Sequence, residues 1–130
     1  MGSVTPYVDK DNLSKNADLK WERDDKIGRA VNYIRNNFRA IIAITDLVDI
    51  ADLNHRKLHR GFIGLFGKAP MQFITWARIE AACEYLLSIG KKIAEVAVDN
   101  GFYDQSSLTQ NFRKQMKVTL LKYRKHKGFS

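Results

Sequence analysis

Six polar side chains between residues 105 and 114 have types and spacings that suit hydrogen bonding to another molecule. They are the amides, hydroxyls and cations Gln105, Ser106, Thr109, Gln110, Arg113 and Lys114. On a helix they lie away from Leu108 and Phe112, which fall four residues apart and would be buried. Asp104 can cap this helix, and Gly101 can end the preceding one. Amides and hydroxyls can bond base edges of DNA, and the two cations can meet phosphates, so the stretch predicts a DNA-reading helix.

A second helix of the same design is predicted over residues 55–66. Asn54 can cap it, and Gly67 can end it. The side expected to be buried carries Leu58, Phe62 and Phe66. The opposite, exposed side carries the polar or basic residues Arg56, Lys57, His59 and Arg60, followed by Ile63. A guanidinium in the register of Arg60 can pair with both acceptors of a guanine.

The two predicted reading helices belong to a longer internal repeat. The first copy contains Leu47, Val48, Asp52, Leu53, Asn54, Leu58, Phe62, Phe66 and Phe73. Its counterparts are Val96, Ala97, Gly101, Phe102, Asp104, Leu108, Phe112, Met116 and Tyr123. The separation is 49 residues before the second helix of each copy and 50 after it. A fixed register with one shift at the turn predicts a duplicated helix-turn-helix.

Apolar residues at helical spacing predict the elements that position these two helices. We expect helices over 24–38, from 43–45 onward, from Pro70 to about 88, over 93–99 and over 118–126. The longest has an apolar stripe made of Phe73, Ile74, Ala77, Ala81, Tyr85 and Leu86. Its length of roughly 27 Å could hold the reading helices near one DNA turn apart, ~34 Å. Leu121, with Tyr123, is expected to anchor the last segment.

The predicted fold is all-α and homeodomain-like, with about seven helices in two helix-turn-helix subdomains joined by a long central helix. A flexible N-terminal arm is expected over 1–23, where no apolar period is sustained. The first subdomain is expected over 24–68, the linker helix over 69–89 and the second subdomain over 90–130. The chain of 130 residues leaves no room beside them for a sensor domain.

Composition and charge favour a polyanionic partner. The net charge is +8, and it is unevenly placed: residues 1–53 carry 8 Lys and Arg against 9 Asp and Glu, whereas 54–130 carry 14 against 5. No apolar run is long enough to cross a bilayer, so we expect a cytoplasmic protein without membrane contact. The single cysteine, Cys83, is expected to lie in or near the core rather than to act as a redox sensor.

Other chemistry is weakly supported. His55 and His59 have the spacing of a helical metal pair, but no third ligand is in register, so no metal or other cofactor is expected. Acidic residues such as Asp24 and Asp46 suit helix starts or solvated faces better than acid–base catalysis. No nucleophile has a base in register, so an enzyme is not expected. Arg78 could equally be a structural hydrogen-bond donor or a phosphate ligand.

The motifs over about 25–126 resemble the DNA-binding domain of the AraC/XylS family of bacterial transcription regulators. The first half matches at Leu58, Arg60, Phe62, Gly67, Pro70, Phe73, Ile74, Arg78 and Ala82. The second half matches at Ile93, Val96, Ala97, Gly101, Phe102, Asp104, Gln105, Ser106, Phe112, Arg113, Lys114, Tyr123 and Arg124. The chain is most similar to the small single-domain activators typified by MarA, SoxS and RamA. It departs from their pattern at His59 and Gln110, and from the wider family at Lys117, often Gly, and Leu120, often Pro.

The resemblance implies a transcription activator at the bacterial nucleoid that binds double-stranded DNA as a monomer and contacts RNA polymerase. It places Arg56, His59 and Arg60 in one major-groove segment and Gln105, Ser106, Thr109 and Gln110 in the next. We expect an asymmetric site of about 20 bp. Two alternatives remain: a DNA-binding fragment of a longer ligand-sensing regulator, and a non-specific architectural DNA-binding protein.

Overall fold

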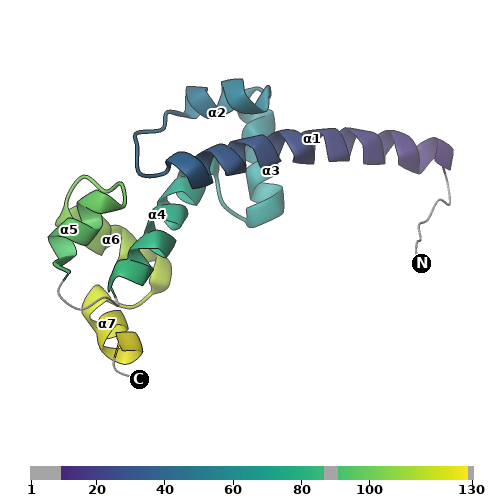
Figure 1. Cartoon of the computed structure of the whole chain (residues 1–130). Helices are drawn as coiled ribbons and strands as arrows, with labels where there is room; N and C mark the ends of the chain where they lie inside the picture. The colour runs from purple at the N-terminus through teal and green to yellow at the C-terminus, as the bar shows by residue number, and fades with distance from the viewer. Residues whose placement is uncertain (1–9, 87–90, 129–130) are drawn as a thin grey trace.

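The computed structural model describes residues 10–86 and 91–128, and within these the side chains of 24–86 and 91–125. The described residues form seven helices and no strand (Figure 1). In chain order they are α1 Lys10–Asn37, α2 Ile44–Ala51, α3 His55–Phe66, α4 Pro70–Leu86, α5 Ile93–Asp99, α6 Gln105–Met116 and α7 Leu120–Gly128. The all-α fold with two helix-turn-helix units around a central helix is therefore confirmed.

The first helix is much longer than expected. Its predicted start at residue 24 is wrong, because α1 already begins at Lys10, and its N-terminal half projects beyond α2 and α3 (Figure 1). Residues 10–23 of the predicted flexible arm are thus helical, while 1–9 lie outside the described residues. No Gly or Pro occurs between Lys10 and Ile27, so a helix nucleated by the packed part can propagate at one added hydrogen bond per residue.

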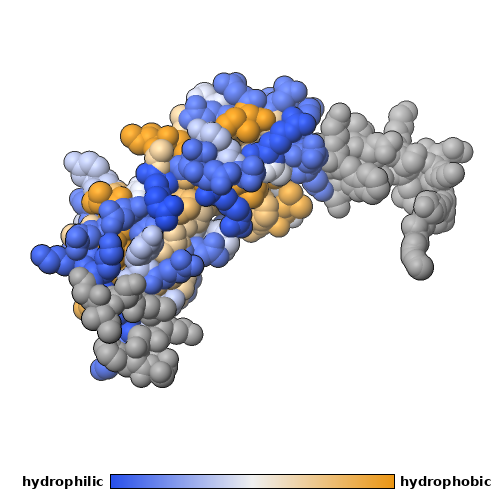
Figure 2. Space-filling model, viewed as in Figure 1, coloured by the Kyte–Doolittle hydropathy of each residue, from blue (hydrophilic) through white to orange (hydrophobic). Residues whose placement is uncertain are grey.

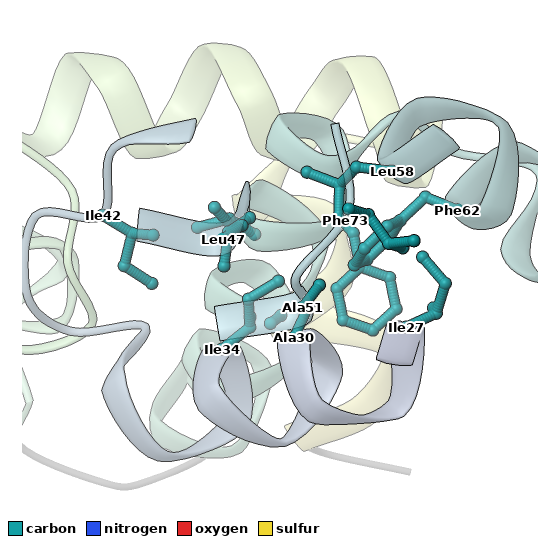
Figure 3. Packing of buried hydrophobic residues seen from close by; sticks show 12 residues of the cluster. Ile27, Ala30, Ile34, Ile42, Leu47, Ala51, Leu58, Phe62 and Phe73 are labelled. Atoms are coloured by element: carbon teal, nitrogen blue, oxygen red, sulfur yellow. The ribbon is translucent and has the colours of Figure 1, made fainter. Parts of the chain in front are cut away.

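The first core is built where α1, α2, α3 and the start of α4 meet (Figure 3). It contains Ile27, Ala30, Ile34, Leu47, Ala51, Leu58, Phe62 and Phe73, all at most 1% exposed. Leu58 and Phe62 are buried as predicted. Phe66 is 36% exposed, so its predicted burial is wrong, although its ring lies 4.7 Å from that of Phe73. Phe66 sits in the last turn of α3, where the helix runs past the edge of the core.

Helix α4 packs against both subdomains with different faces. Phe73, Ile74 and Ala77 belong to the first core, whereas Ile79, Ala82 and Leu86 belong to the second. At about 100° per residue these two sets point about 170° apart. The single apolar stripe predicted for this helix is therefore incomplete, because it lacks Ile79 and Ala82 and includes the half-buried Ala81 and Tyr85.

The second core joins α4 to α5, α6 and α7. It contains Ile79, Ala82, Leu86, Val96, Ala97, Phe102, Leu108, Phe112 and Leu120. The last segment is anchored by Leu120, 4% exposed, and not by Leu121, 69% exposed, so that prediction is wrong by one position. Tyr123 does contact this core, with its ring 5.4 Å from that of Phe112. One position on a helix is a turn of about 100°, which exchanges a buried for an exposed direction.

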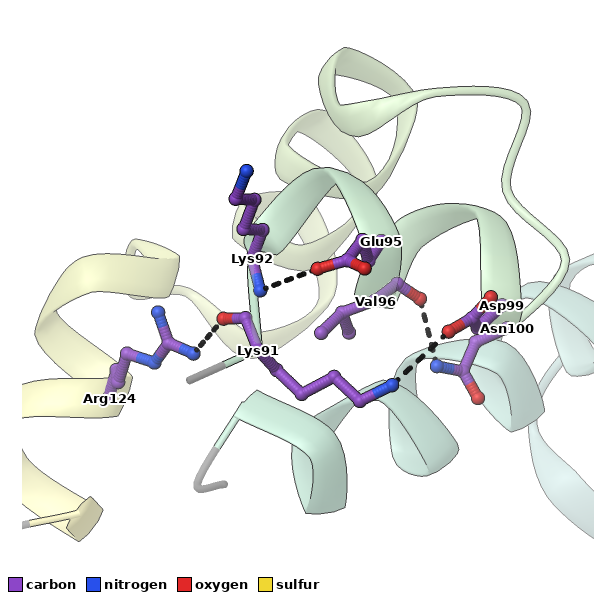
Figure 4. A network of polar contacts seen from close by, with 7 residues as sticks. All are labelled: Lys91, Lys92, Glu95, Val96, Asp99, Asn100 and Arg124. Carbon is purple, nitrogen blue, oxygen red and sulfur yellow. Dashed lines mark hydrogen bonds and ion pairs between the residues drawn. The ribbon is translucent and has the colours of Figure 1, made fainter. Parts of the chain in front are cut away.

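Polar contacts fix both ends of α5 in the second subdomain (Figure 4). The Glu95 carboxylate accepts a hydrogen bond from the Lys92 backbone N–H at 3.3 Å, which caps the helix start. At its end the buried Asn100 donates to the Val96 carbonyl at 2.8 Å. Arg124 of α7 donates to the backbone carbonyls of Leu86 and Lys91, at 2.6 and 2.8 Å, and so ties α7 to the end of α4.

The geometry confirms the internal repeat. The rings of Phe62 and Phe73 lie 5.4 Å apart at 72°, and those of their counterparts Phe112 and Tyr123 lie 5.4 Å apart at 70°. The turns match as well: Asp52 and Gly101 both have positive φ, of 54° and 93°. The same backbone path is therefore built twice, with different side chains on its surface.

The outer surface carries mostly hydrophilic residues on the face seen in Figure 2, with hydrophobic residues in separate patches. Within the described ranges, no helix combines the length and apolarity needed to span a bilayer. Cys83 is half-buried in α4, and burial raises the pKa of its thiol above the ordinary value. Its predicted near-core position is confirmed.

Candidate nucleic-acid interface

The first candidate reading helix, α3, begins at the predicted cap. The Asn54 side-chain oxygen accepts a hydrogen bond from the Lys57 backbone N–H at 2.9 Å, which satisfies one of the free donors at the helix start. Leu58 and Phe62 point into the core, so the opposite side of α3 faces outward. All four predicted contacts on this helix are exposed: Arg56, Lys57, His59 and Arg60. Three of them, with His55, Ile44 and Pro70, line a depression of about 580 Å³.

The second candidate reading helix, α6, is held in the same way. The Asp104 carboxylate accepts a hydrogen bond from the Ser107 backbone N–H at 2.8 Å, and Leu108 and Phe112 are fully buried. The six predicted contacts are all exposed: Gln105, Ser106, Thr109, Gln110, Arg113 and Lys114. The Gln110 amide donates to the Ser106 hydroxyl at 3.3 Å. These two side chains are thus held as one hydrogen-bonding unit.

The cations of α3 and α6 form no ion pair with any side chain that the structure describes. The ion pairs among the described side chains are Lys26–Asp52, Arg29–Asp25 and Lys91–Asp99. None of them uses a side chain of either reading helix. As far as the described side chains go, the positive charge of Arg56, Lys57, Arg60, Arg113 and Lys114 is therefore available to an anionic partner.

A cleft of about 500 Å³ lies between the C-terminal ends of α3 and α6, with α4 forming its floor. Its lining includes three cations, Lys68, Lys114 and Lys117, and the amide side chains of Gln72, Asn111 and Gln115. The ammonium of Lys68 lies 5.4 Å from the centre of the Trp76 ring, which limits its freedom. Lys68, Gln72 and Lys117 were not predicted as site residues, because they stand at helix ends or on the scaffold helix rather than in a repeating pattern.

Three alternatives from the sequence can be compared with the structure. Arg78 is a structural donor: its Nε and Nη2 donate to the backbone carbonyls of Phe38 and Ala40, at 2.7 and 2.9 Å. Among the described residues His55 and His59 have no third His, Cys, Asp or Glu that could complete a metal site. Asp46 caps α2 by accepting from the Ala43 N–H at 3.0 Å, but Asp24 lies inside α1, not at a helix start.

The comparisons with known proteins agree with this geometry. The profile of a family described as a helix-turn-helix domain matches residues 47–126, which run from α2 into α7. Among solved structures, the C-terminal domain of AraT, a response regulator from Geobacillus stearothermophilus, superposes with a TM-score of 0.71 at 26% identity, covering 81% of this chain and 88% of that one. The chain belongs to the AraC-type helix-turn-helix family.

Two further similar proteins connect the fold with DNA and with transcription. The DNA-binding domain of AdpA, solved in complex with a target DNA, superposes with a TM-score of 0.69 at 25% identity over 77% of this chain and 90% of that one. The lactose operon transcription activator of Staphylococcus xylosus is 23% identical over 103 residues, or 79% of this chain. The chain spans 37% of that relative's length. It therefore carries the DNA-binding part of a transcription regulator of the AraC family, and double-stranded DNA is the partner of such domains.

Proposed function

We propose that the chain binds an asymmetric site of about 20 bp as a monomer, with α3 and α6 in two adjacent major-groove segments. The single observation that carries the proposal is that one chain builds two equally capped helix-turn-helix units with different exposed faces. A dimer would supply two identical faces and would favour an inverted repeat. One chain with two different faces needs neither a second chain nor an inverted repeat in the DNA.

The proposed roles follow from side-chain chemistry. Arg60 suits bidentate pairing with guanine, and the amides of Gln105 and Gln110 suit adenine. Arg56, His59, Ser106 and Thr109 complete the contacts to base edges on the same two helices. Lys57, Arg113 and Lys114 would neutralise phosphates and supply a salt-dependent part of the affinity.

The cleft between the reading helices fits the proposed arrangement. Two adjacent major-groove segments on one face of a duplex are separated by a minor groove with phosphates along both edges. The three lysines of the cleft, Lys68, Lys114 and Lys117, would meet those phosphates. Helix α4, with 17 residues, measures roughly 26 Å. If it holds α3 and α6 closer than the ~34 Å repeat of straight DNA, the duplex bends at a cost on the order of 1–6 kcal/mol.

We further propose that the protein activates transcription through a contact with RNA polymerase, in the bacterial cytoplasm. This step rests on the resemblance to small activators of the family and on the S. xylosus relative, whose name states an activator role. The alternative of a fragment from a longer ligand-sensing regulator draws on the small share of that relative's length that the chain spans. A reporter carrying the selected site upstream of a promoter, assayed with this chain alone, separates the two.

Selection of bound duplexes from a randomised library, followed by three measurements, tests the DNA proposal. Native mass measurement should give one chain per duplex, and hydroxyl-radical footprinting should protect two segments about one turn apart, ~10 bp. Competition against bulk DNA at physiological salt should show a preference of ~10³ or more. Two chains per duplex or a protected inverted repeat would refute the monomer. Loss of the preference would instead indicate an architectural binder.

A further inference from the structure

Arg78 stands at the boundary between the two subdomains. On α4 its direction falls between the face that carries Phe73 and Ala77 and the face that carries Ile79 and Ala82. Its guanidinium reaches back to the end of α1, where Nε and Nη2 donate to the carbonyls of Phe38 and Ala40 at 2.7 and 2.9 Å. The C-terminal end of a helix presents free carbonyls and partial negative charge, so a cation with forked donors suits this position.

The turn between α5 and α6 contacts the hydrogen bond that the Arg78 Nε donates to the Phe38 carbonyl. A Cβ atom added to Gly101 would lie 2.7 Å from the Arg78 Nε and 2.7 Å from the Phe38 carbonyl oxygen. Such distances leave no space for any side chain. Gly101 also has φ of 93°, and it precedes the α6 cap Asp104 by three residues. The turn that precedes α6 therefore packs, at Gly101, against the hydrogen bond between Arg78 of α4 and the Phe38 carbonyl at the end of α1.

We propose that this joint, formed by Arg78, the carbonyls of Phe38 and Ala40, and Gly101, fixes the angle and spacing between α3 and α6. The joint thereby determines which half-site spacing in DNA the protein accepts. Arg78 is a positioning residue in this inference, since it need not touch DNA. The DNA part of the inference rests on the proposed two-segment binding, whereas the joint itself can be tested on the free protein.

The chain contains a matched control for each half of the joint. Arg124 makes the same pair of arginine-to-carbonyl bonds, at 2.6 and 2.8 Å, but entirely within the second subdomain. Gly67 shares the left-handed backbone of Gly101, with φ of 69°, but a Cβ there would meet nothing within 4 Å. Arg124→Gln and Gly67→Ala therefore remove comparable bonds or add comparable backbone strain without touching the joint.

The first experiment measures residual dipolar couplings of backbone amides in the free protein, fitted separately for α2–α3 and for α5–α6. In the wild-type protein, in Arg124→Gln and in Gly67→Ala, the two fits should give the same alignment tensor. Arg78→Gln and Gly101→Ala should each require two different tensors, because their subdomains reorient. If Arg78→Gln does not fold, Gly101→Ala alone tests whether the joint fixes the orientation of the subdomains. If every folded joint variant gives a single tensor with the wild-type orientation, the proposal that the joint fixes the subdomains is refuted.

The second experiment measures affinity for the duplex selected by the wild-type protein, with base pairs inserted or deleted between its two protected segments. Each inserted pair rotates one segment by about 35° relative to the other. The wild-type protein and both controls should lose about tenfold or more per displaced pair, because the second segment no longer binds in the same encounter. Arg78→Gln and Gly101→Ala should lose less than about threefold.

The outcomes separate the joint from the proposed function. If the wild-type protein depends steeply on spacing and the joint variants depend on it equally, the inference is wrong and the DNA proposal stands. If the wild-type protein is indifferent to spacing, two-segment binding is wrong, and the DNA half of the inference fails with it. The dipolar couplings then still decide whether the joint fixes the subdomains.

Discussion

Replacing Lys117 by glycine should stabilise the protein. Lys117 ends α6 in the left-handed conformation, with φ of 64° and ψ of 10°, and its N–H donates to the Arg113 carbonyl at 3.0 Å. The counterpart at the end of α3 is Gly67, with φ of 69°, ψ of 15° and the same bond to Ile63 at 2.9 Å. The two backbones are nearly identical, but only glycine adopts this conformation without a steric penalty.

The expected gain follows from two opposing effects. A residue with a Cβ in the left-handed region is disfavoured by about 1–2 kcal/mol. Glycine gives the unfolded chain more freedom, which offsets roughly 0.4–1 kcal/mol of that gain. The Lys117 side chain is exposed, so its removal leaves no cavity. The free energy of unfolding should therefore rise by about 0.5–1 kcal/mol, and Tm by a few degrees, on the order of 2–6 °C.

Urea denaturation followed by circular dichroism measures this change, and Lys117→Ala is the matched control. Alanine removes the same ammonium group but keeps the Cβ and its strain, so it should give no gain. Equal stabilisation by alanine and glycine would refute the backbone argument and assign the effect to charge. The proposed cleft contact adds a second readout: both variants should weaken DNA binding and lower the salt slope by the same amount, since both remove one cation.

Three further outcomes are expected. Arg60→Ala should weaken binding to the selected duplex by ~1–3 kcal/mol and relax preference at one base pair, and equal losses on specific and random DNA would make Arg60 a phosphate contact instead. Lys114→Ala should weaken specific and random binding alike and reduce the salt slope by ~1, so an unchanged slope would remove it from the interface. Leu108→Asp should unfold the second subdomain, because an unpaired charge at this fully buried position costs several kcal/mol. A cooperative melt at the wild-type temperature would contradict the assigned core.

The sequence predicts best the elements whose ends are marked by local chemistry. The spans of α3 and α5 match their predicted residues, and α6 starts directly after its predicted cap Asp104. Caps and left-handed glycines act through hydrogen bonds a few residues away, so their effect can be read from neighbours in the chain. The exposed faces of α3 and α6 follow in turn, because Leu58 and Leu108 fix the rotation of each helix.

Features that depend on packing at a distance are harder to predict. Ile79 is buried because a second subdomain covers its side of α4, and this cannot be inferred from the helix alone. Glycine is a poor helix former, yet Gly61 lies inside α3, because a Cβ there would overlap the Ile27 side chain of α1. The joint at Arg78 combines residues forty positions apart with a glycine from a third element. Tertiary contacts of this kind decide how two predictable units are placed relative to each other.

The duplication itself argues for an asymmetric target. Both units keep the same aromatic pair, Phe62 with Phe73 and Phe112 with Tyr123, at equal ring separations. Selection for the fold would act on these scaffold positions, which the two copies share. The exposed faces do not match: α3 presents cations and imidazoles, whereas the first two turns of α6 present amides and hydroxyls. Guanidinium groups favour guanine and amides favour adenine, so we expect the half-site under α3 to be richer in G·C pairs than the half-site under α6. A selected site with the same composition in both halves would mean that one helix contributes positioning without base readout.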